Sequence, residues 1–142
     1  MIEIGQSPEW LFAKSQEVRA FRINWDDETS SRSLVGHDSL LNPTRVPIDG
    51  VLLNNKQVER LKKAVLDDHP PHPVAACHYP HHGFVFTDPQ RAIIGHIEIC
   101  FMCSNKRTKP NGFADYWDFD VLEELVSDLG IEIANQEWGA NK

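Results

Sequence analysis

Two apolar segments separated by a four-residue turn constrain the fold of this chain more than any other feature. The segments cover residues 83–87 and 92–101, and both are rich in β-branched and aromatic residues. The intervening Asp88-Pro89-Gln90-Arg91 is typical of a type I turn, because proline already has the backbone angle that the second turn position needs. The pattern therefore predicts a β-hairpin.

Three further segments have helical spacing. Ser7-Pro8-Glu9 is a helix-start signal and predicts a helix over 8–14. Apolar residues recur at helical spacing over 55–67, after Asn54 or Asn55 as a cap, and again over 119–129, where a glycine follows. Shorter apolar patterns predict strands over 17–24 and 131–133.

These elements predict an α+β fold, a small antiparallel sheet built around the hairpin and packed against two or three helices. The length suits one domain over residues 1–142. We interpret the polar segment 26–47 as a long loop and the Pro/His-rich segment 67–75 as a connector.

Composition excludes several classes of function. The net charge is −7, whereas nucleic-acid binding depends on clustered basic residues, so we expect no nucleic-acid partner. No segment reaches the roughly 18 consecutive apolar residues of a membrane helix. The first residues also lack the basic region and apolar core of a signal peptide. We expect a cytoplasmic protein with no membrane partner.

Strand alternation divides the predicted hairpin into two faces. The shortest turn around Pro89 and Gln90 places Thr87 opposite Ala92, and His81 opposite Glu98. The expected core face carries His82, Phe84, Phe86, Ile93, Ile97, Ile99 and Phe101. The expected outer face carries His81, Val85, Ile94, His96, Glu98 and Cys100. A slip of one residue would exchange the two faces.

Cysteine and histidine residues gather at one end of this hairpin. The metal-ligating candidates are Cys77, His81, His82, Cys100 and Cys103. Cys100 and Cys103 have the spacing of a zinc-binding pair, provided that the strand ends in a turn, and Cys77 with His81 or His82 supplies the other two ligands. The alternative is that the thiols are inert core residues, because free cysteine is among the most buried residue types.

The remaining histidines have a simpler interpretation. We expect His69, His72 and His78 to be solvated loop residues. His96 is interpreted equally well as a plain surface residue.

The segment from Cys77 to Cys103 resembles a motif of small, poorly characterised bacterial proteins. The motif has the pattern Cys-x2-Pro-[His/Arg]-His, then a hairpin, then Ile-Cys-Phe-x-Cys. Cys77, His82, Cys100 and Cys103 match it, whereas His81 stands where the group varies. The resemblance thus favours His82 as the fourth ligand, and it implies no activity because none is established for the group.

The sequence favours a non-enzymatic binding or interaction domain whose Cys/His hairpin site holds structural zinc. The alternative is an acidic immunity- or inhibitor-type protein that binds a basic partner through the region 110–141. That region has eight carboxylates, interleaved aromatic residues and no lysine or arginine. A thiol-dependent enzyme is the third hypothesis, although Cys100 and Cys103 stand at a strand end rather than at a helix N-terminus, where a thiol pKa is lowered.

Overall fold

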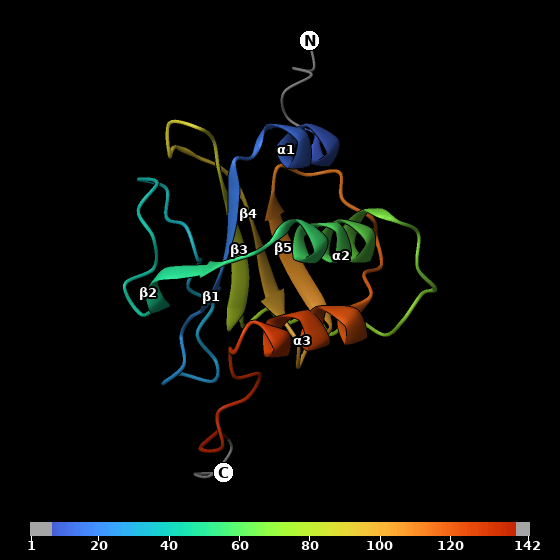
Figure 1. Ribbon diagram of the computed structural model, residues 1–142. Helices are drawn as coiled ribbons and strands as arrows, with labels where there is room; N and C mark the ends of the chain where they lie inside the picture. The colour runs from blue at the N-terminus through green and yellow to red at the C-terminus, as the bar shows by residue number, and fades with distance from the viewer. Residues whose placement is uncertain (1–6, 139–142) are drawn as a thin grey trace.

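The computed structural model describes residues 7–138, which form one antiparallel sheet with helices on one face (Figure 1). The elements in chain order are α1 (Pro8–Lys14), β1 (Glu17–Arg22), β2 (Val46–Leu52), α2 (Asn55–Leu66), β3 (His82–Thr87), β4 (Ile93–Cys100), β5 (Asn105–Lys109) and α3 (Phe119–Asp128). The strand order is β2-β1-β3-β4-β5. The predicted α+β class is confirmed.

The main core lies between the sheet and the helices. It joins helix residues such as Leu61 and Leu125 to strand residues such as Phe84 and Ile97, all of them fully buried. Phe84, Phe86, Ile97 and Ile99 lie on this side, as strand alternation predicts.

The hairpin register is two residues away from the predicted one. Phe84 pairs with Ile97, and Gly83 rather than His81 pairs with Glu98. One residue of the shift arises in the turn, where Arg91 has a left-handed φ of 66°. The other arises at a bulge between Phe86 and Thr87.

An even shift keeps the faces unchanged over most of the hairpin, but the bulge exchanges them near the turn. Ile94 therefore packs against the main core, whereas Ile93 packs on the opposite side of the sheet. The faces of these two isoleucines are the reverse of those predicted, because the prediction assumed an unbroken alternation.

The predicted strand over 131–133 is wrong. The Ile131 amide instead donates to the Val126 carbonyl at 3.2 Å, and Gly130 has a φ of 80°. This arrangement caps the C-terminus of α3. Conversely, the basic run after Ser104 forms edge strand β5, which the sequence analysis did not predict.

The segment between β1 and β2 covers the face of the sheet opposite the helices. It has no helix or strand over residues 23–45, apart from an isolated bridge between Val35 and Leu41. Leu34 is fully buried against Val85 of β3. The buried Asn24 and Asn42 side chains hydrogen-bond to each other at 2.9 Å and to several carbonyls of this segment. We call residues 24–45 the covering loop.

The start of α2 provides a matched test of helix capping. Asn54 accepts the Gln57 amide at 2.9 Å, and the Gln57 side chain accepts the Asn54 amide at 2.9 Å. Asn54→Ala is expected to lower the free energy of unfolding by about 1 kcal/mol, measured by urea denaturation. Asn55→Ala is the control, because Asn55 is exposed and its side chain makes no hydrogen bond within residues 7–138. Equal losses in the two variants would contradict this assignment.

Candidate functional site

Strands β4 and β5 present a row of polar side chains on the face that the covering loop shields. Cross-strand partners in an antiparallel pair share a face. Their register pairs His96 with Lys109 and Glu98 with Arg107. Gly83 lies beside Glu98 on β3, and a Cβ there would stand 2.6 Å from a methyl carbon of Leu34. The glycine therefore lets the covering loop approach the carboxylate.

Glu98 is a fully buried carboxylate with several nitrogen partners. Its Oε1 accepts from Arg107 Nη2 at 2.6 Å and Nε at 3.1 Å, and its Oε2 accepts the Leu34 amide at 3.2 Å. The Nε2 atoms of His96 and His78 lie 3.3 Å and 3.7 Å from the two carboxylate oxygens. The carboxylate therefore joins β4, β5, the covering loop and the segment before β3.

These contacts determine the protonation state of Glu98. Burial acts to raise the pKa of Glu98, but the polar contacts with His78 and His96, the hydrogen bonds of Arg107 and the charge of Arg107 outweigh it and lower the pKa to about 2. An ionised carboxylate can only accept hydrogen bonds. In any hydrogen bond between His96 Nε2 and the carboxylate, the imidazole must therefore be the donor.

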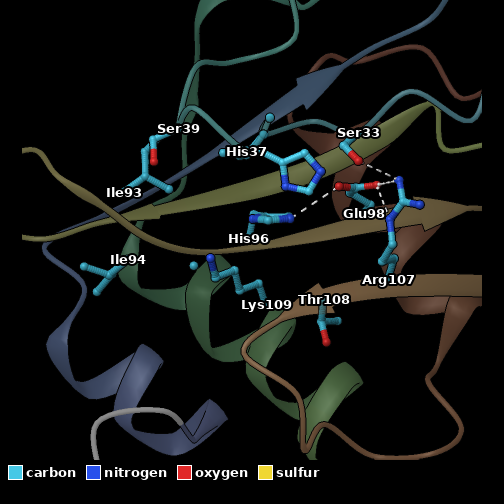
Figure 2. A pocket seen from close by; sticks show the side chains of 13 residues that line it. Ser33, His37, Ser39, Ile93, Ile94, His96, Glu98, Arg107, Thr108 and Lys109 are labelled. Atoms are coloured by element: carbon cyan, nitrogen blue, oxygen red, sulfur yellow. Dashed lines mark hydrogen bonds and ion pairs between the residues drawn. The ribbon is translucent and has the colours of Figure 1, made fainter.

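A cavity of about 400 Å³ opens in front of this cluster. In Figure 2, His37 points from the covering loop toward the strand that carries His96 and Glu98, and Arg107 reaches Glu98 from β5. His37 and Lys109 are exposed at the rim, whereas Glu98 is buried at the base. We call this cavity, with His37, His96, Glu98, Arg107 and Lys109, the Glu98 pocket.

Arg107 also ties the covering loop to β5. Its Nη2 donates to the Ser31 carbonyl at 3.2 Å and to the Ser33 hydroxyl at 2.9 Å, in addition to Glu98. Nη1 makes no hydrogen bond within residues 7–138, and neither does the Lys109 ammonium group. The pocket therefore keeps cationic nitrogens available for a ligand.

The three predicted thiol ligands lie together at the end of the same sheet face. The Cys77 and Cys103 sulfurs are 2.9 Å apart. Burial, with the adjacent Cys100 and Cys77 thiols, raises the pKa of Cys103. Strand β4 ends at Cys100 and a turn follows, as convergence of Cys100 and Cys103 requires.

The two predicted histidine ligands have other partners. His81 Nε2 lies 3.1 Å from the Asp27 carbonyl, and the ring packs on Trp138 with 4.1 Å between centroids. His82 Nε2 lies 2.7 Å from the Glu132 carbonyl. Within residues 7–138, no group of three or more His, Cys, Asp or Glu side chains is arranged to hold a metal ion. Zinc binding stays a prediction.

The Glu98 cluster includes His78, which was interpreted as a solvated loop residue, and His96, for which a plain surface position was one of two equal interpretations. The side chains of His78 and His96 are only 14% and 12% exposed. The sequence signal for this site was a glutamate between two buried isoleucines, followed by a short basic run. It was missed because β5 was not predicted, and β5 places Arg107 beside Glu98.

The aromatic residues proposed as partner anchors have internal contacts. Trp117 is buried, and Phe113 and Phe119 pack against the main core. Trp138 packs on Trp25, with 4.8 Å between ring centroids. Residues 139–141 of the predicted interface lie outside the described residues, and binding of a basic partner stays a prediction.

No helix in residues 7–138 combines the length and the apolar character needed to cross a membrane. Comparison with family models, curated proteins and solved structures gives no match to this chain.

The ion pair of the buried Glu98 with Arg107 predicts a specific loss of stability. Glu98→Gln removes the charge opposite Arg107, so we expect the free energy of unfolding to fall by about 2–3 kcal/mol at pH 7. The loss is smaller than for a fully buried pair, because the Arg107 side chain is 44% exposed. The matched control is Glu17→Gln, which breaks the partly exposed pair with Arg19 and should cost less than about 1 kcal/mol.

The same pair has a pH signature. Because the folded-state pKa of Glu98 is depressed to about 2 from an ordinary 4.5, its contribution is present above pH 4.5 and declines as pH falls toward 2. The difference between wild type and Glu98→Gln should shrink across this range in urea unfolding experiments. A difference that stays constant down to pH 2 would contradict the ion pair.

His82 predicts a second pH dependence. Burial lowers the pKa of His82 to about 4 from 6.5, although the hydrogen bond with the Glu132 carbonyl acts to raise it, and the neighbouring His81 and Arg22 lower it further. Between pH 6.5 and 4, His82 is therefore protonated in the unfolded chain but not in the folded chain. The contribution of the neutral His82 to the free energy of unfolding is complete above pH 6.5 and declines as pH falls toward 4. From pH 7 to pH 5 we expect wild type to lose about 2 kcal/mol more than His82→Phe, measured by chemical denaturation. Parallel pH profiles would contradict this account.

Proposed function

We propose that this chain is a small binding domain that holds a small anion, a carboxylate or a phosphate, in the Glu98 pocket. The observation that carries the proposal is the set of nitrogen groups around one cavity. Arg107 and Lys109 bring two positive charges, and Glu98 offsets only one of them. The pocket thus has a net positive charge in a chain whose net charge is −7.

The available donors suit an anionic oxygen. Arg107 is anchored through Nε and Nη2, which fixes the guanidinium plane and leaves Nη1 for a ligand. Lys109 supplies a second cation. His37 supplies an imidazole group from the covering loop, and His96 supplies another from β4. Charge-assisted hydrogen bonds of this kind are about twice as strong as neutral ones.

The size of the pocket favours a small molecule. A cavity of about 400 Å³ lies at the lower end of the range of small-molecule sites, about 300–1,000 Å³. Val35 and Ile93 line it beside the charged groups. A ligand with one anionic group and a short apolar part would match both kinds of lining.

The test is to titrate the protein separately with inorganic phosphate, acetate and succinate. Binding is measured by isothermal titration calorimetry and by changes in NMR chemical shifts. We expect at least one of them to bind with a dissociation constant of about 1 mM or lower, which corresponds to about 4 kcal/mol. Affinity should fall as salt concentration rises, because part of the attraction is electrostatic.

Lysine variants provide the specificity control. Lys109→Gln should weaken binding by about tenfold, or about 1.4 kcal/mol. Lys63→Gln makes the same change in net charge at an exposed position of α2, away from the pocket, and should leave affinity unchanged. The proposal is rejected if none of the three anions binds at 10 mM, or if the two lysine variants behave alike.

A further inference from the structure

A second chemical feature lies at the open end of β4 and does not depend on the anion proposal. The sulfurs of Cys77 and Cys103 are in direct contact at 2.9 Å. Cys100 and Cys103 are buried, whereas Cys77 is partly exposed. The three thiols therefore form a cluster in which only Cys77 is readily reached from solvent.

Hydrogen bonds on both sides of the sulfurs hold the two cysteines in place. The Ala75 amide donates to the Cys103 carbonyl at 2.9 Å. Asn105 Nδ2 donates to the carbonyls of Ala75 and Cys77 at 3.2 Å and 3.1 Å. The backbone before β3 is thus fastened to the turn between β4 and β5. The sulfurs need to move by less than an ångström to reach the disulfide bond length of about 2.05 Å.

The sulfur distance favours a direct bond over a shared metal ion. Two thiolates that bind one tetrahedral zinc ion, each at about 2.3 Å from the metal, stand about 3.8 Å apart. Cys77 and Cys103 are closer than that by almost an ångström. The geometry is therefore closer to that of a thiol pair before oxidation.

We propose that Cys77 and Cys103 form a reversible intramolecular disulfide when the protein meets a hydroperoxide. The Cys77 thiolate attacks the terminal peroxide oxygen, the O–O bond breaks, and alcohol or water leaves, which gives a sulfenic acid on Cys77. The Cys103 sulfur then attacks the Cys77 sulfur, the S–O bond breaks, and hydroxide leaves as water with the Cys103 proton. Two thiols lose two electrons, and the hydroperoxide gains them.

The order of these steps follows from exposure. Cys77 meets the oxidant first because it is partly exposed, whereas Cys103 is buried. Cys103 lies behind Cys77, and the two sulfurs are in contact. Cys103 therefore escapes direct oxidation and reacts with the sulfenic sulfur that forms beside it.

The test oxidises the reduced full-length protein with a small excess of hydrogen peroxide, blocks the remaining thiols, and maps tryptic peptides by mass spectrometry. Cleavage after Lys63, Arg91 and Lys106 puts Cys77 in one peptide and both other cysteines in another. We expect these peptides to be linked, and dithiothreitol to release them. The oxidised protein should melt about 10 °C higher than the reduced protein, because the bond closes a long loop.

Serine variants identify the partner of Cys77. Cys100→Ser should keep the link between the peptides, and Cys103→Ser should lose it. A link that persists in Cys103→Ser, a bond between Cys100 and Cys103, or sulfinic acid on Cys77 without any link would each overturn the proposal. The proposal would also be overturned if protein treated with a chelator, to remove any bound zinc, still formed no link between the two peptides.

Discussion

The ion pair between the buried Glu98 and the partly exposed Arg107 is the interaction on which the arrangement of this protein depends. A carboxylate with no solvent exposure is stable only if donors surround it, because an unpaired buried charge costs several kcal/mol. Here the donors come from an edge strand and from the covering loop, and two imidazoles lie within 3.7 Å of the carboxylate oxygens. The need to satisfy one carboxylate thus explains why a loop without regular structure lies in a fixed place on the sheet.

The two faces of the sheet have different roles, because one packs the core and the other carries the polar site. One face is covered by helices and holds the main core. The opposite face bears, along β4, His96, Glu98 and Cys100 at alternate positions, with the charged partners of the first two on β5. Because strand side chains alternate, apolar residues between these three, such as Ile97 and Ile99, stabilise the fold without entering the site. A polar site can then be built on the outer face without a gap in the core.

The sequence predicted the α+β class, the hairpin, β1 and the three helices because their signals are local, whereas the edge strands β2 and β5 were not predicted. The hairpin, all three helices and their limits follow from periodicity and capping residues that lie within a few positions of each other. The Glu98 pocket depended instead on distant pairings. Arg107 is nine residues from its partner and falls on a strand with little apolar character, and Leu34 is brought by a loop that has no periodic pattern. The exact register also depended on a bulge and on a left-handed Arg91, which no short-range pattern indicates.

The thiol cluster and the Glu98 pocket are joined by one residue. His78 follows Cys77 in the chain, and its Nε2 lies 3.7 Å from Glu98 Oε1. A bond between the Cys77 and Cys103 sulfurs would remove freedom from the backbone that carries this imidazole. Its ring nitrogens have no hydrogen bond in the described residues, so this contact with the carboxylate is the main polar interaction of the ring. The same short backbone segment therefore carries one sulfur of the thiol pair and one neighbour of the Glu98 carboxylate.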